Sequence, residues 1–200
     1  MSSTNDSNEI TALLAGIPQS ANVLGQPAAP VTLAYFADLQ CPYCRDFSLE
    51  VLPSIIERWV AAGKLRIESH ALQAATHDPE VFIAQQVAAL AAGRQERAWH
   101  FIETFYAQQG EENSGYLTDA YLQGIAGQVT GLDLARWASD RRDPELANEI
   151  AGDARAAENA GLTGTPSFLI GASGDAMSAF SPTDPRSFDT AIEGLLQRAA

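Results

Sequence analysis

The segment FADLQCPYCRDF, residues 36–47, holds the only two cysteines of the chain, Cys41 and Cys44. Two residues separate them, a spacing that occurs in metal sites, in structural disulfides and in redox centres. A structural zinc site needs four ligands, and the three histidines of the chain do not supply a matching pair. A disulfide that closes so short a loop adds little stability. The pair therefore indicates redox chemistry, and we expect no metal ion and no cofactor.

The segments that flank the pair predict a reactive environment for the first cysteine. Residues 31–38 (VTLAYFAD) are apolar and rich in β-forming residues, so we expect a buried strand. Residues 44–63 repeat apolar side chains at helical spacing and end at a glycine, which predicts a helix. Pro53 lies inside this helix and should kink it. Cys41 then lies at the helix N-terminus, with Pro42 in the first turn, where free amides and the helix dipole stabilise a thiolate.

A cysteine on an amphipathic helix also has a structural interpretation, as a small side chain of the core. The context of strand, short loop and helix is the one expected around a redox-active CxxC, and it favours the redox interpretation.

Composition excludes several other classes of function. The 200 residues are 46% hydrophobic, enough for a sizeable core in one domain or in a domain with a large insertion. The net charge of −13 disfavours binding to nucleic acid or to an anionic lipid surface. No apolar run approaches the roughly 18 residues that cross a bilayer. The polar start MSSTNDSNE, residues 1–9, has no signal-peptide pattern and predicts a disordered tail.

A second motif follows far downstream, in ENAGLTGTPSFLIGASG, residues 158–174. A helix is expected to end at Gly161, and Thr165-Pro166 then precedes a short apolar strand, residues 167–170. Proline at a strand start breaks no ladder hydrogen bond. A bond between any residue and proline is also the place where a cis peptide is accessible.

The region between the two motifs, from His77 to Glu158, reads as successive helices without a strand. Two of these helices begin at Asp-Pro steps, Asp78-Pro79 and Asp143-Pro144, and a third step, Asp184-Pro185, opens the C-terminal helix. One stripe of large side chains at helical spacing predicts core packing rather than a ligand pocket. The stripe consists of Trp99, Ile102, Phe105 and Tyr106.

CPYC after a strand, with TGTPSFLIG far downstream, resembles the thioredoxin superfamily and within it the DsbA-like thiol–disulfide oxidoreductases. The resemblance extends from about Gly16 to the end of the chain. Glutaredoxins share CPYC, but their downstream proline follows much sooner than Pro166 does here. The resemblance implies an α/β chain with a thioredoxin fold and a large all-helical insertion. Its parts are residues 1–16 (polar tail and short N-terminal helix), 17–75 (thioredoxin fold with CPYC), 76–160 (helical insertion) and 161–200 (thioredoxin fold with the Thr-Pro loop and C-terminal helix).

The resemblance also implies roles for the residues of the CPYC motif. Cys41 is expected to be the exposed nucleophile, which forms a mixed disulfide with a protein substrate. Cys44 is expected to be its partner, which opens and closes the internal disulfide. Pro42 and Tyr43 are expected to tune the Cys41 thiolate and to contact the substrate.

The downstream motif implies a second contact with the substrate. Pro166 is expected to be a cis-proline facing the cysteines, and Thr165 is expected to offer its backbone to an extended substrate chain. The implied partners are unfolded or cysteine-containing proteins and a redox partner that resets the cysteine pair. Nothing resembles an added dimerisation domain, so we expect a monomer.

One position departs from the pattern of this family. Six residues before the nucleophile, its members usually carry a buried acid that manages the proton of the second cysteine, and here that position holds Tyr35. Asp38 is the carboxyl group nearest in sequence, and we expect it to be solvated or hydrogen-bonded at the end of the strand. Proton transfer at the second cysteine therefore requires a separate explanation.

Three functions fit these residues. The first is an oxidoreductase that donates disulfides to protein substrates outside the cytoplasm, and this is the one that the resemblance favours. The second is a cytoplasmic disulfide reductase or detoxifying enzyme that runs the same chemistry in reverse. The third is a thioredoxin-fold binding module whose cysteines are idle. An N-terminus trimmed of a signal or anchor segment predicts a periplasmic or cell-surface protein, and a true start at Met1 predicts a cytoplasmic one.

Overall fold

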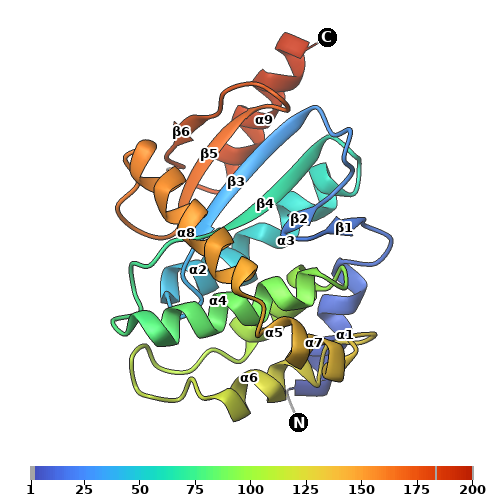
Figure 1. Ribbon diagram of the computed structural model, residues 1–200. Coiled ribbons are helices and arrows are strands. Elements are labelled where there is room, and N and C mark those ends of the chain that lie inside the picture. Colours follow the sequence, from blue (N-terminus) through green and yellow to red (C-terminus); the bar gives the residue numbers. More distant parts are fainter. Residues whose placement is uncertain (1–2, 183, 200) are drawn as a thin grey trace.

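Six strands form one mixed β-sheet at the centre of the structure (Figure 1). The computed structural model describes residues 3–182 and 184–199, and within them the strands lie in the order β1-β2-β4-β3-β5-β6. The strands are β1 (Gln19–Ser20), β2 (Val23–Leu24), β3 (Val31–Ala37), β4 (Leu65–Ala71), β5 (Ser167–Ala172) and β6 (Ser178–Phe180).

The strand that leads to the cysteines, β3, lies in the middle of the sheet. It runs parallel to β4 and antiparallel to β5, and all of its residues are buried. Its unbroken apolar sequence fits a strand that is covered on both faces. The strand expected over residues 31–38 is confirmed, and its carboxyl end delivers the chain directly to the CPYC motif.

Helices cover both faces of the sheet and one of its ends. In Figure 1, α8 lies in front of the sheet, α9 and the helical run that starts with α2 lie behind it, and α4 to α7 lie beneath it. The helices are α1 (Ser3–Leu13), α2 (Pro42–Asp46), η1 (Phe47–Val51), α3 (Leu52–Ile55), η2 (Ile56–Val60), α4 (Pro79–Gly93), α5 (Ala98–Ala107), α6 (Asp119–Ala126), α7 (Leu134–Asp140), α8 (Pro144–Asn159) and α9 (Arg186–Ala199). η1 and η2 are π-helical.

The helix expected over residues 44–63 is present but irregular. Its α-helical segments alternate with the π-helical segments η1 and η2, and the backbone N–H of Leu52 bonds to the carbonyl of Phe47, five residues back. Pro53 follows at once and has no N–H to donate. The wider π-helical turn therefore lies where proline would interrupt the regular α-helical hydrogen bonds. The helical run ends at Val60, and Gly63 follows with φ of +68°.

The region between β4 and β5 is helical, as the sequence predicts. Residues 77–158 are all described and contain no strand. Asp78 and Asp143 cap α4 and α8 by accepting hydrogen bonds from the backbone two residues further on. Asp184 accepts from the backbone of Ser187, and α9 begins at Arg186. The predicted stripe lies in the core, because all four of its members are buried: Trp99, Ile102, Phe105 and Tyr106.

The N-terminal segment differs from its prediction. The short helix expected within residues 1–16 is present as α1, but it begins at Ser3, inside the segment expected to be a disordered tail (residues 1–9), and residues 1–2 lie outside the described part of the chain. Ile10 and Leu14 are buried in the main core, and α1 packs against α5. The helix is therefore stabilised by its packing on α5, which the polar composition of its first residues does not predict.

Candidate active site

Cys41 is the residue that caps the N-terminus of α2. Its backbone is extended, with φ of −69° and ψ of 121°, and Pro42 occupies the first helical turn. The Cys41 N–H donates to the Asp38 carbonyl at 2.9 Å, which closes a tight turn between β3 and the helix. The predicted position of Cys41 is confirmed, so the free amides of the first turn point toward its sulfur.

The Cys41 sulfur faces the loop that precedes β5. Its Sγ donates to the carbonyl oxygen of Thr165 at 3.3 Å, and the Thr165-Pro166 peptide bond is cis. The sheet brings these distant residues together, because β5 runs antiparallel to β3 and pairs Phe36 with Ser167. Cys41 is only 3% exposed, so the expectation of a freely exposed nucleophile is wrong. The Thr165 backbone packs against the sulfur and limits its contact with solvent.

The environment of Cys41 favours its thiolate. A hydrogen bond from the Cys44 thiol is the largest cause that lowers the pKa of Cys41 from 9.0 to about 6, against the opposing effect of burial. The Thr165 hydroxyl lowers this pKa too, and it is a buried group without another hydrogen-bond partner among the described residues. The N–H groups of Tyr43 and Cys44 add to the effect. Cys41 is therefore mostly thiolate, the nucleophilic form, at neutral pH.

The environment of Cys44 favours the opposite form. Cys44 is fully buried, and this burial is the largest cause that raises its pKa well above 9.0. The neighbouring Cys41 raises the pKa further, through its hydrogen bond and its charge. The pKa values of the two thiols therefore differ in opposite directions: Cys41 favours the thiolate and Cys44 the thiol. Such a difference is typical of two groups with different chemical roles.

Tyr35 lies beside Cys44 from the strand side. Its hydroxyl donates to the Cys44 carbonyl at 3.4 Å and lies 3.4 Å from the hydroxyl of Tyr106. Both tyrosines are buried, and burial raises the pKa of each well above 10.0. The strand position at which the resemblance implies a buried acid therefore holds a neutral phenol.

Asp38 is hydrogen-bonded and not solvated, so of the two alternatives expected for it the hydrogen-bonded one is confirmed. It is fully buried, and its oxygens lie 2.6 Å from Thr76 Oγ1 and 2.9 Å from Gln85 Nε2. Its further donors are the backbone N–H groups of Gln40, Ala74, Ala75 and Thr76. Asp38 thereby fastens the turn before Cys41 to the loop that follows β4.

The remaining residues of the predicted site lie around the cysteines. Tyr43 is 71% exposed, the most exposed large apolar side chain of the described residues. Pro42 and Pro166 are half-buried, on α2 and on the loop before β5. The structure therefore brings together Cys41, Cys44 and Thr165, and it leaves Tyr43 projecting from the first turn of the helix.

The family model described as Thioredoxin matches residues 19–193. The chain belongs to the thioredoxin family. One curated relative is the probable disulfide bond formation protein D of Bacillus anthracis, which is 24% identical over 148 residues, or 74% of this chain and 68% of the relative.

Solved structures of DsbA-like proteins share the fold of this chain. Oxidised BdbD of Bacillus subtilis matches with a TM-score of 0.76 and 19% identity, over 91% of this chain and 97% of that one. The α-DsbA1 of Wolbachia pipientis matches with a TM-score of 0.73 and 23% identity, over 96% of this chain and 97% of that one. Together with the paired cysteines and the curated relative, this fold identifies a protein disulfide oxidoreductase.

Two residues near the cysteines of this thioredoxin-family chain are absent from the sequence prediction. Gln109 donates to the carbonyl oxygens of Leu39 and Cys41, at 2.7 Å and 3.1 Å. Glu103 is buried in α5, accepts from Ser48 Oγ at 2.7 Å, and has its pKa raised by burial to about 8. One feature of the sequence could have drawn attention to Glu103: it is the only acidic residue in the apolar helix AWHFIETFYA.

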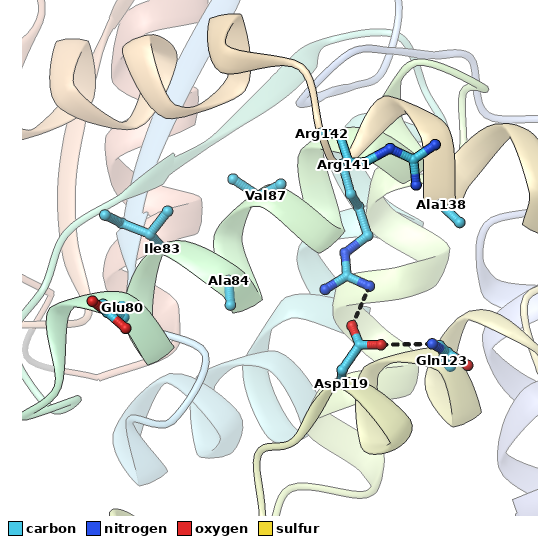
Figure 2. Close-up of a pocket in the computed structure, with 9 residues that line it drawn as sticks. All are labelled: Glu80, Ile83, Ala84, Val87, Asp119, Gln123, Ala138, Arg141 and Arg142. Carbon is cyan, nitrogen blue, oxygen red and sulfur yellow. Dashed lines mark hydrogen bonds and ion pairs between the residues drawn. The ribbon is translucent and has the colours of Figure 1, made fainter.

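Two clefts of the thioredoxin-family chain, each of about 520 Å³, lie away from its cysteines. Figure 2 shows one of them, between α4, α6 and α7, where Arg141 pairs with Asp119 at 2.6 Å and Asp119 accepts from Gln123. Neither cysteine lines this cleft. In the described part of the chain, no three His, Cys, Asp or Glu side chains are grouped to hold a metal ion.

Proposed function

We propose that this oxidoreductase donates disulfides to protein substrates through Cys41 and Cys44. The observation that carries the proposal is the difference between the two thiols, one with a pKa of about 6 and the other with a pKa raised far above 9.0. A stabilised Cys41 thiolate favours the reduced form of the pair, and an oxidant whose reduced form is stable passes its disulfide on.

The reaction has two steps of thiol–disulfide exchange. A substrate thiolate attacks the Cys41 sulfur, the bond between Cys41 and Cys44 breaks, and Cys44 leaves with the electron pair. A second substrate thiolate then attacks the substrate sulfur of the mixed disulfide, and Cys41 leaves as a thiolate. The low pKa of Cys41 makes it a good leaving group in this second step. The substrate is oxidised by two electrons and the cysteine pair is reduced.

The surface around Cys41 supports a role for its neighbours in holding the substrate. Tyr43 offers an exposed aromatic ring beside the nucleophile, and Pro42 and Pro166 offer half-buried apolar surface. Thr165 lies two residues before β5, so its backbone is placed to pair with an extended substrate chain. All four would contact the substrate segment that carries the reacting cysteine.

The same proposal covers partners, location and organisation. Its substrates are cysteine-containing or unfolded proteins, a separate partner reoxidises the pair, and the chain works as a monomer outside the cytoplasm. Within the described residues, no helix has the length and apolar character needed to span a bilayer. Residues 17–75 and 161–200 form the redox unit, and residues 76–160 are the insertion that packs beside it.

The proposal is tested by incubating the oxidised protein with a reduced, unfolded protein that folds only when its disulfides form. We expect stoichiometric disulfide formation in the substrate and equal loss of the Cys41–Cys44 disulfide. Cys41→Ser should abolish this transfer. Reduction of an oxidised substrate, with no transfer in the forward direction, would support the reductase, and a pair that does not react would support the binding module.

A further inference from the structure

Glu103 is a buried acid for which the exchange chemistry described above has no role. Its side chain comes from α5, is 2% exposed, and accepts one hydrogen bond, from Ser48 Oγ to Oε2. Its other oxygen, Oε1, is buried and has no hydrogen-bond partner among the described residues. An unpaired charge in such a place is costly, whereas a neutral carboxyl group is not. The surroundings of Glu103 therefore suit a carboxyl group that carries a proton.

The helix that carries Glu103 packs directly on the cysteine helix. α5 contacts η1, and Ser48, the donor to Glu103, lies four residues after Cys44, about one turn along the same helical run. Three residues after Glu103 on α5 comes Tyr106, and residues at that spacing share one face of a helix. Glu103 is close enough to Tyr106 that its charge raises the pKa of that tyrosine.

Two tyrosine hydroxyls lead from this position to Cys44. The Tyr106 hydroxyl lies 3.4 Å from the Tyr35 hydroxyl, and either of them can be the donor. The Tyr35 hydroxyl also reaches Cys44, because a hydrogen bond between them lowers the pKa of the Cys44 thiol. Among the described residues no hydrogen bond joins Glu103 to Tyr106, so the proton crosses this gap when the carboxyl group, whose last torsion is soft, reorients.

Cys44 needs a proton when the internal disulfide is opened. When the internal disulfide opens, Cys44 leaves as a thiolate, and burial makes that thiolate unfavourable. Cys44 and Tyr35 are both fully buried, and Tyr106 is 1% exposed, so bulk water does not reach this side of the sulfur. The proton must come from within the protein or along a path that the protein provides.

We propose that Glu103 supplies the proton that Cys44 takes up when the internal disulfide is opened, relayed through Tyr106 and Tyr35. This inference rests on the proposed disulfide exchange. A substrate thiolate bonds to Cys41 and the Cys41–Cys44 bond breaks. Cys44 leaves with the electron pair and takes a proton from Tyr35, which regains one from Tyr106 and ultimately from Glu103. Glu103 becomes a carboxylate and regains its proton from solvent after the substrate departs.

The acidities along this path agree with the order of transfer. The pKa of Glu103, which burial raises to about 8, keeps the acid protonated at neutral pH and close to the acidity that suits a proton donor. Burial raises the pKa values of both tyrosines well above 10.0, so they pass a proton on rather than lose it. Asp38, from the turn after β3, is the other acid whose charge acts on Tyr106.

The test measures how fast dithiothreitol reduces the Cys41–Cys44 disulfide between pH 5 and pH 10, roughly the range around the pKa of Glu103. Glu103→Gln keeps the shape of the side chain and removes its exchangeable carboxyl proton. We expect it to slow reduction by about a hundredfold at neutral pH, the lower end of what a positioned proton donor contributes. The inflection that the wild type shows near the pKa of Glu103 should disappear. Glu57→Gln, which removes an exposed glutamate from η2, is the matched control and should leave rate and profile unchanged.

Two further measurements separate proton donation from a structural effect. Glu103→Asp keeps an acid and should recover part of the rate, and Tyr106→Phe should slow reduction without changing Glu103. In the infrared spectrum of the oxidised protein at neutral pH, a protonated-carboxyl band should be present in the wild type and in Tyr106→Phe. The same band should be absent in Glu103→Gln.

Three outcomes would overturn the inference. Wild-type rate and pH profile in Glu103→Gln would show that the acid is not needed, and so would an infrared spectrum in which Glu103 is already a carboxylate at neutral pH. Equal slowing in Glu103→Asp and Glu103→Gln would assign the effect to packing. These outcomes leave the exchange reaction intact, whereas a wild-type disulfide that fails to cycle would overturn both the inference and the proposed function.

Discussion

The Cys41 sulfur lies 3.3 Å from the carbonyl oxygen of Thr165, at the edge of the sheet where β3 ends and the antiparallel β5 begins. This contact joins the two motifs of the sequence into one site. As a thiol, Cys41 donates to that carbonyl. As a thiolate it accepts from the Thr165 hydroxyl, which has no other partner among the described residues. The loop before β5 therefore influences the acidity of the nucleophile as well as covering it.

Removing the Thr165 hydroxyl should raise the pKa of Cys41. In Thr165→Val the shape of the side chain is kept and one hydrogen bond to the thiolate is lost, so we expect a rise of about one unit, equivalent to about 1.4 kcal/mol. The ultraviolet absorbance of the thiolate, followed against pH, measures it. Thr163→Val, at an exposed position two residues earlier, is the control. An unchanged pKa in Thr165→Val would show that the hydroxyl does not act on the sulfur.

The Cys44 thiol should account for the largest part of the low pKa of Cys41. Cys44→Ala removes that donor, and we expect the pKa of Cys41 to rise from about 6 toward 9.0. Cys44→Ser retains a hydroxyl donor and should keep most of the lowering. The rate of alkylation of Cys41 as a function of pH measures both variants. Equal pKa values for the alanine and serine variants would contradict the assignment of this effect to a hydrogen bond.

Local signals in the sequence predict much of this architecture. The apolar run of β3, the proline after Cys41 and the Asp-Pro steps of α4 and α8 each act within a few residues. The structure confirms each of them. The position of Cys41 at the helix N-terminus follows from these signals alone, and the resemblance to DsbA-like proteins supplied the link to Thr165.

Contacts between distant segments could not be predicted in the same way. Asp38 finds donors on residues 74–76 only because β3 pairs with β4, and the partners of Glu103 depend on how α5 packs on η1. Tyr35 could be recognised as a departure from the family pattern, but nothing local indicates that its hydroxyl meets that of Tyr106. Each of these contacts is set by packing and not by a sequence period.

A part-buried ion pair between β4 and α8 should make stability depend on pH. Burial alone lowers the pKa of His70, but its hydrogen bonds to Asp153, at 2.7 Å, and to Glu68 outweigh burial and raise the pKa to about 9. A raised pKa means that the protonated histidine stabilises the fold. This contribution, about 2–3 kcal/mol, is fully present below pH 6.5 and is lost as pH rises through about 9.

Asp153→Asn tests that contribution by removing the charge that faces His70. We expect the variant to be less stable than the wild type at pH 6, and the difference between them to shrink toward pH 10. The free energy of unfolding in urea at several pH values measures it. Asp175→Asn removes an exposed charge and should show no such trend. A difference that is constant with pH would mean that His70 is not the group responsible.

The Tyr43 ring should matter for protein substrates and not for the chemistry of the cysteines. In Tyr43→Ala we expect a severalfold fall in the rate at which an unfolded protein is oxidised, because a 71%-exposed aromatic contact is lost. The reaction with oxidised or reduced glutathione, which is too small to use that contact, should proceed at the wild-type rate. Tyr43→Phe keeps the ring and should behave as the wild type. Equal losses for glutathione and for the protein substrate would place Tyr43 in the chemistry instead.

The central claim is that the reduced form of the Cys41–Cys44 pair is stabilised enough to make this oxidoreductase a disulfide donor. The most direct test is to equilibrate the protein in glutathione buffers of known ratio and to measure the fraction in which the two cysteines are joined. We predict a reduction potential of about −180 mV or higher, in the range of disulfide donors and isomerases. A potential near −270 mV, typical of thioredoxin-like reductants, would contradict the account.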